Sequence, residues 1–132
     1  MRFGFISTML HYLIFEETAS DGHSLTWEAM ASVPPARLPA VLDEAAHVMA
    51  WVTQYLGAPP CPLDDGGEWD ALLEVQAEGG APRCLPWVSN SGHIQPLLIP
   101  ENTPWVTVTV TLVVCSAWAD SFLAAWHSDV ES

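Results

Sequence analysis

The stretch WVTVTVTLVV, residues 105–114, decides the fold of this chain. Apolar side chains alternate along it with threonines, which is the pattern of a β-strand with one buried and one solvent-facing side. Trp105 has the same parity as the threonines, so we predict that its indole faces solvent or a partner. The apolar set expected in the core is Val106, Val108, Val110, Leu112 and Val114.

The first third of the chain predicts a β-hairpin. β-branched and aromatic residues from Met9 to Glu17 lead into Asp21-Gly22, a pair typical of a two-residue type I′ turn. Apolar and polar residues alternate again in SLTWEAMASV, residues 24–33, which predicts the second strand. That strand ends at Pro34-Pro35, since proline has no N–H for the hydrogen-bond ladder.

Two amphipathic helices are expected. Apolar residues recur at three- and four-residue spacing over residues 38–56, Pro39 fits the first turn, and Gly57 fits the C-terminal cap. Ser116 is a suitable N-cap for a second helix. The apolar face of that second helix would be Ala119, Phe122, Leu123 and Trp126.

Between the helices, residues 69–77 alternate in the manner of a strand whose outer face is largely charged. Gly79-Gly80 then supplies a turn, and PRCLPWVSN, residues 82–90, can return as a fourth strand with Pro86 at an edge or a bulge. Residues 89–104 are expected to be irregular.

The element order is therefore ββαβββα, within a single domain that spans residues 1–132. Each strand has one apolar face and each helix has one apolar stripe, so a layer of helices on one side of a sheet buries all of them. We predict an α+β fold: an antiparallel sheet of four to five strands with two helices packed on one face, ferredoxin-like or a rearranged relative.

The charge balance is strongly acidic. The chain has 16 Asp and Glu against 3 Lys and Arg, and its formal net charge is −13. Such a chain repels phosphate backbones and anionic lipid, which disfavours direct binding to nucleic acid or to a membrane. It attracts cationic partners over long range. The alternative to a cationic partner is that the acidic residues only keep a chain with 7 Trp soluble.

The three cysteines are widely spaced, and the sequence has neither C-x-x-C nor a local pair of histidine ligands. We therefore expect reduced thiols, no bound metal, no cofactor and a cytoplasmic location. One disulfide with one free thiol is the alternative. The mostly apolar N-terminus resembles a weak signal peptide, but polar residues interrupt it, and no segment is long and apolar enough to span a bilayer.

Negative charge concentrates in CPLDDGGEWDALLEVQAEGG, residues 61–80, which contains no Lys or Arg. Calcium favours such oxygen ligands and flexible glycines, but the spacing does not match an EF-hand loop. Acids beside exposed tryptophans suit a basic protein surface better, because charge speeds association and aromatic rings anchor the complex. The predicted partner-binding residues are Asp64, Asp65, Glu68, Trp69, Asp70, Glu74, Glu78 and Trp105.

The sequence carries no enzyme signature, since it lacks G-x-S-x-G, a P-loop and G-x-G-x-x-G. The leading hypothesis is an acidic protein that neutralises a cationic protein partner, as a bacterial toxin-immunity protein does when it occludes the active site of a nuclease-like or nucleotide-acting toxin. The alternatives are a phage- or plasmid-encoded inhibitor of a host nuclease by nucleic-acid charge mimicry, a small hydrolase or ligand-binding domain that uses His47 or Cys115, and a homodimer held by its Trp face.

Overall fold

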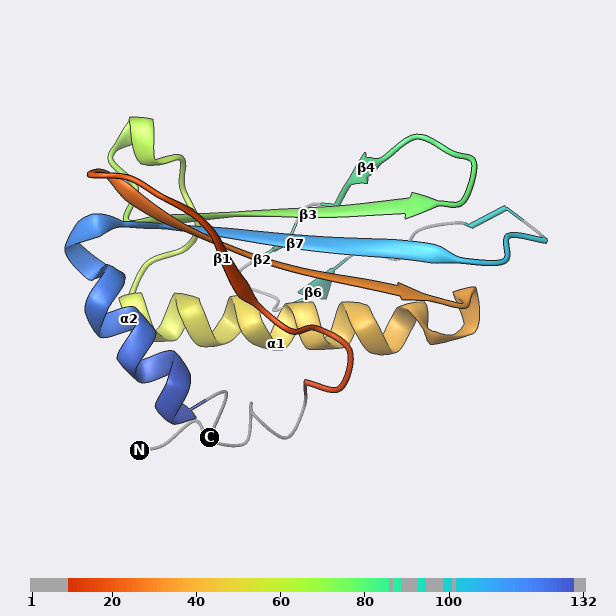
Figure 1. Ribbon diagram of the computed structural model, residues 1–132, viewed down its shortest axis with the longest axis horizontal. Coiled ribbons are helices and arrows are strands. Elements are labelled where there is room, and N and C mark those ends of the chain that lie inside the picture. The colour runs from red at the N-terminus through yellow and green to blue at the C-terminus, as the bar shows by residue number, and fades with distance from the viewer. Residues whose placement is uncertain (1–9, 86, 89–92, 95–98, 101, 130–132) are drawn as a thin grey trace.

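The computed structural model describes residues 10–85, 87–88, 93–94, 99–100 and 102–129. Its main sheet consists of β1 (Glu16–Ser20), β2 (Ser24–Val33), β3 (Trp69–Ala77), β4 (Arg83–Cys84) and β7 (Val106–Cys115). Two helices, α1 (Leu38–Leu56) and α2 (Ser116–Asp129), pack on one face of this sheet (Figure 1). A separate two-stranded sheet consists of β5 (Trp87–Val88) and β6 (His93–Ile94).

The central strand of the main sheet is β7. The strand order is β1-β2-β7-β3-β4, and every neighbouring pair is antiparallel. All ten residues of β2 and all nine of β3 pair with β7, which explains why its pattern is the clearest in the sequence. The predicted fold class is confirmed: one antiparallel sheet with two helices, in a mixed α+β arrangement.

An aromatic cluster joins the two helices to the sheet. The ring centroids of Trp27 on β2 and Phe122 on α2 lie 5.2 Å apart, and those of Trp51 on α1 and Trp126 on α2 lie 5.6 Å apart. All four side chains are buried. Because large aromatic rings bury more apolar area than other side chains, this cluster strongly favours the packing of both helices on the same face.

The expected boundaries of α1 are confirmed. Pro39 lies in its first turn, and Gly57 ends it with a φ of 72° while donating its N–H to the carbonyl of Thr53 at 2.9 Å. The sequence predicts Ser116 as the N-cap of α2, but Ser116 is the first residue of the helix itself. The helix therefore begins one residue earlier than expected. Within the described residues, no helix combines the length and the apolar character needed to cross a bilayer.

The first strand begins later than the sequence indicates, because residues 11–13 bind a side chain instead of a neighbouring strand. The Glu44 carboxylate of α1 accepts the main-chain N–H groups of these three residues at 2.6 to 3.2 Å. The strand starts at Glu16, so the expected span from Met9 to Glu17 is wrong; Met9 itself lies outside the described residues.

The turn of the first hairpin is not of type I′. Neither Asp21 nor Gly22 has a positive φ. Instead, the Asp21 carboxylate accepts the N–H groups of His23 at 2.7 Å and Ser24 at 2.8 Å. The aspartate side chain thus takes the place of a main-chain acceptor, and the turn closes without left-handed backbone.

The predicted fourth strand, residues 82–90, is only partly formed. Two of its residues, Arg83 and Cys84, pair with β3, and Trp87–Val88 instead pairs with β6. Pro86 and residues 89–90 lie outside the described residues. A proline at this position has no N–H to offer a ladder, which is the local reason to expect an interruption. The segment 89–104, expected to be irregular, contributes the short strand β6.

Candidate functional site

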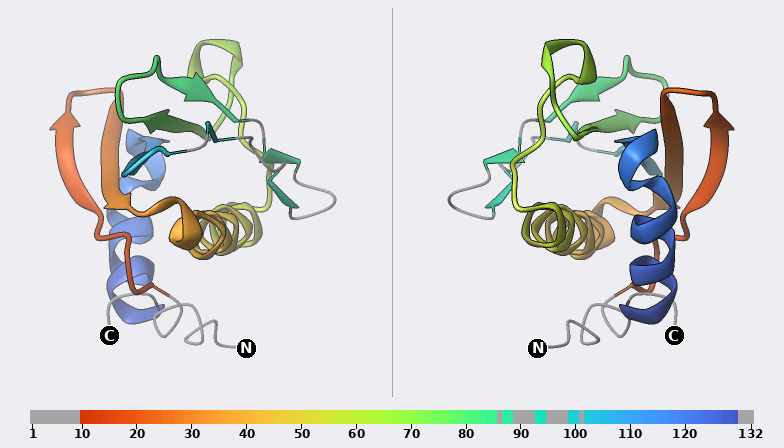
Figure 2. Two further views of the ribbon diagram at one scale, coloured as in Figure 1. Left: turned by 90° about the vertical axis from the view of Figure 1, so that its right-hand side faces the viewer. Right: turned by 90° about the vertical axis from the view of Figure 1, so that its left-hand side faces the viewer.

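One side of the main sheet carries no helix among the described residues, and we call it the open face. Figures 1 and 2 show both helices on the other side of the sheet. Side chains alternate between the two sides along each strand, so the register decides which residues share the open face. They are Ser24, Thr26, Glu28, Met30 and Ser32 on β2, Asp70, Leu72, Glu74 and Gln76 on β3, and Thr107, Thr109, Thr111, Val113 and Cys115 on β7, with Glu16 of β1 opposite Glu28 and Cys84 of β4 opposite Glu74.

Acidic and apolar side chains oppose each other across β7 on this face. Residues that pair across β2, β7 and β3 form rows on this face, and each of the two central rows contains one exposed apolar side chain, one threonine and one carboxylate. The rows are Met30–Thr109–Glu74 and Leu72–Thr111–Glu28. Met30 is 60% exposed and Leu72 is 43% exposed, so the open face offers apolar contact surface at its centre.

Among the described residues, the carboxylates of the open face have no cationic partners. Glu16 on β1 stands directly opposite Glu28 on β2, which brings two like charges together. The Oε2 atom of Glu28 accepts a hydrogen bond of 3.3 Å from the Thr111 hydroxyl, and Asp70 Oδ1 accepts the N–H of Ala71 at 2.8 Å. Within the part of the chain that the structure describes, none of these acids makes an ion pair.

The acidic loop that precedes β3 lies at one end of the sheet. Asp64 and Asp65 are exposed in a 3-10 turn, Leu63–Asp65, and Glu68 is half-buried. The main chain ties this loop to the sheet, since the N–H of Cys115 donates to the Glu68 carbonyl at 2.9 Å. These three predicted partner-binding acids therefore border the open face at its Trp69 end.

Two other predicted partner-binding residues, Glu78 and Trp105, lie at the opposite end of the sheet. The nine residues of β3 separate them from the acidic loop, a span of roughly 30 Å. Asp70 and Glu74 lie between the two ends, on the open face. The predicted residues thus extend along the whole length of the face, and the prediction that Trp105 faces outward is confirmed, because its side chain is 51% exposed.

Trp69 is the exception among the predicted partner-binding residues. Its side chain is 0% exposed, and its Nε1–H donates to the Ala58 carbonyl at 2.8 Å. A side chain without exposed surface cannot reach another protein, so the prediction that Trp69 anchors a partner is wrong. Its parity with Leu73 and Val75, which are also buried, is the sequence signal that places it in the core.

Glu16 and Glu28 are acids of the open face that sequence reasoning missed. Both lie far from the acidic segment in the sequence, and only strand pairing brings them to the same surface. The available signal was the alternation in β2, which puts Glu28 on the polar side of that strand.

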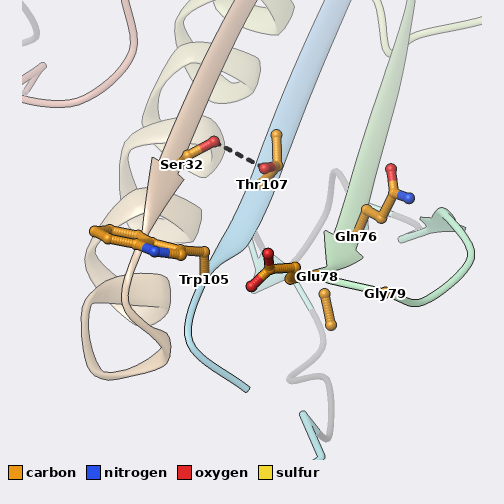
Figure 3. Close-up of a pocket in the computed structure, with 7 residues that line it drawn as sticks. Ser32, Gln76, Glu78, Gly79, Trp105 and Thr107 are labelled. Carbon is orange, nitrogen blue, oxygen red and sulfur yellow. Dashed lines mark hydrogen bonds between the residues drawn. The ribbon is translucent and has the colours of Figure 1, made fainter.

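A hollow of about 630 Å³ lies at the Trp105 end of the open face. Figure 3 shows the indole of Trp105 and the carboxylate of Glu78 bordering it. The Ser32 and Thr107 hydroxyls, 2.8 Å apart, form part of its lining. The main chain fixes the two sides of the hollow together, because the N–H of Glu78 donates to the Trp105 carbonyl at 3.0 Å.

Four residues with acid–base chemistry, His11, Asp43, Glu44 and His47, line a hollow beside α1. Nδ1 of His47 lies 2.7 Å from the main-chain oxygen of Asp43, in the same helix. The three cysteines are free, and Cys115 is half-buried on the open face. Among the described residues, no three His, Cys, Asp or Glu side chains converge in a way that could hold a metal ion.

No protein-family model, curated protein or solved structure matches this chain. Its function must therefore be inferred from the charge, exposure and geometry of the open face.

Proposed function

We propose that this protein is an acidic binding protein that neutralises a cationic protein partner through its open face. The observation that carries this proposal is a sheet face left uncovered by helices, on which unpaired carboxylates surround exposed apolar side chains. Protein interfaces combine these two features, with apolar anchors at the centre and charged groups around them.

The charges and the apolar side chains would act at different stages of binding. A formal net charge of −13 attracts a basic surface and speeds encounter. Met30, Leu72 and Trp105 then supply the apolar contact that slows dissociation. Acids spread along the whole face fit a broad basic surface better than a single basic side chain.

The class of protein that this arrangement fits best is a bacterial toxin-immunity protein. A toxin that acts on nucleic acid or nucleotides has a basic active-site cleft, because its substrate carries phosphate charges. An acidic sheet face that covers such a cleft would block substrate entry by steric and electrostatic occlusion, without chemistry of its own.

Capture from a lysate of the source organism tests the proposal, with bound proteins eluted by steps of increasing salt. The wild type is compared with the open-face variant Glu28→Lys/Glu74→Lys. The matched control is Asp43→Lys/Asp120→Lys, which makes the same charge change at exposed positions of α1 and α2. Circular dichroism first establishes that all three proteins fold alike.

The proposal predicts a basic protein that the wild type and the helix control retain and the open-face variant loses. The purified wild type should also inhibit the activity of that protein. Equal retention by all three proteins, or no retained protein at all, would contradict the assignment of the open face as the binding surface.

A further inference from the structure

The hollow at the Trp105 end of the open face combines an aromatic wall with an unpaired negative charge. Trp105 is 51% exposed and lines the hollow, so part of its indole is open to contact. The Glu78 carboxylate borders the same hollow and makes no hydrogen bond or ion pair with any residue that the structure describes. An aromatic ring and a carboxylate that meet in one hollow are the two groups that attract an organic cation most strongly.

The geometry distinguishes between the two cationic side chains of proteins. A lysine ammonium is a compact, strongly hydrated point charge without a planar face, and the aromatic cages that hold ammonium groups consist of several rings. Among the described lining residues, Trp105 is the single aromatic side chain, and its flat ring matches the flat face of a guanidinium. A guanidinium can stack on the indole of Trp105 while its N–H edge donates to the Glu78 carboxylate.

Neutral acceptors complete the lining. The hydroxyls of Ser32 and Thr107 bond to each other at 2.8 Å and keep lone pairs that are available to a further donor. The Gln76 side chain donates its own N–H to the carbonyl of Gly80 at 2.8 Å, so its amide is held in place. Within the described lining of the hollow, no Lys or Arg side chain competes for Glu78.

We propose that the hollow bordered by Trp105 and Glu78 is a binding pocket for an arginine side chain of the protein partner. This inference rests on the proposed function for the origin of the arginine, and it deepens that function by naming one group that the partner presents. The pocket lies at the edge of the open face, so an arginine seated there would fix the register of the partner along the strands.

The test uses a small probe and no partner protein. N-acetyl-L-arginine methylamide is titrated into ¹⁵N-labelled protein, and the indole N–H resonance of Trp105 is followed, assigned by its loss in Trp105→Phe. The expected result is a saturable shift of that resonance. The neutral citrulline analogue should give no shift, and N-acetyl-L-lysine methylamide should bind at least about fivefold more weakly, because it cannot stack as a plane.

Two matched variants separate the pocket from general charge attraction. Glu78→Gln should weaken binding of the arginine probe by about tenfold, since it removes the charge-assisted hydrogen bond. Asp43→Asn makes the same charge change at an exposed position of α1, away from the open face, and should alter binding by less than about twofold, because salt screens it.

Three results would overturn the inference: no shift of the Trp105 indole, equal shifts with citrulline or lysine, or equal weakening by both variants. A titration without the expected shift would refute the arginine pocket but would not contradict capture of a partner by the open face. If the titration is positive but no partner is captured, the hollow binds guanidinium compounds and the proposed function is refuted.

Discussion

Glu16 and Glu28 stand directly opposite each other in the register of β1 and β2, so two carboxylates from neighbouring strands share the open face. Like charges in this position destabilise a sheet, whereas opposite charges stabilise it. A cationic surface bound over both carboxylates would relieve their repulsion. If the proposed function holds, the pair would link a cost in stability to a gain in binding.

Glu16→Gln should raise the free energy of unfolding by about 0.2–1 kcal/mol, because it removes the repulsion with Glu28. The matched control is Glu17→Gln, whose cross-strand partner is the uncharged Trp27. Urea unfolding of both variants checks the prediction. Equal stabilisation by the two changes would show that relief of net charge, and not the facing pair, is responsible.

Glu44 has a structural role that should be separable from binding. It is 4% exposed, and both of its carboxylate oxygens accept main-chain N–H groups of residues 11–13. Glu44→Gln replaces one acceptor with a donor and should lower the free energy of unfolding by about 1–3 kcal/mol. Asp43→Asn, at the exposed neighbouring position, should change it by less than about 0.5 kcal/mol. Urea unfolding measures both effects, and equal stability of the two variants would contradict the role of Glu44.

Asp21 should make stability depend on acid pH. The N–H of His23, with that of Ser24, holds the pKa of the Asp21 carboxyl below its usual value. Because the folded pKa is lowered, the stabilisation is present above the unfolded pKa of about 3.9 and is lost as pH falls through the folded value.

Comparison of Asp21→Asn with the wild type isolates this effect. The difference in unfolding free energy should be constant above about pH 5 and should shrink below about pH 4. Thermal unfolding at a series of pH values measures it. A difference that stays constant down to the most acid pH would mean that the Asp21 charge is not held by the turn.

The acidic loop contains a glycine that approaches the main chain closely. A Cβ at Gly67 would clash with the main-chain oxygen of Cys61, whereas a Cβ at Gly22 would meet no atom within 4 Å. Gly67→Ala should therefore lower the free energy of unfolding by about 1–3 kcal/mol, since the loop must shift. Gly22→Ala should be neutral or stabilise by up to about 1 kcal/mol. Similar urea midpoints for the two variants would argue against the close approach of Gly67 to the main chain of Cys61.

Local periodicity made the centre of the fold predictable. The alternation of β7 places Val106 in the core and Trp105 outside it, and both placements are confirmed by their exposure. The same holds for α1, whose stripe of apolar residues and Gly57 cap mark its extent in the sequence. These signals involve residues that are neighbours along the chain, so a single sequence suffices to detect them.

The errors arise where distant groups compete with local preference. The N–H groups of residues 11–13 donate hydrogen bonds to Glu44, which lies 31 to 33 positions away in the sequence. No local sequence pattern predicts such a contact. In the candidate site, composition located the acids of residues 61–80, but Glu16 and Glu28 join them only through strand pairing. The burial of Trp69 follows its parity with Leu73 and Val75 along β3, and not the charge of its neighbours in the sequence.

The measurement that tests the central claim most directly is the association rate of the captured partner over a series of salt concentrations. For the wild type and for Asp43→Lys/Asp120→Lys, the rate should fall by about tenfold or more as salt rises. Glu28→Lys/Glu74→Lys should associate slowly and with little dependence on salt. An open-face variant that associates as fast as the wild type, with the same dependence on salt, would contradict the claim that the open face binds a cationic partner.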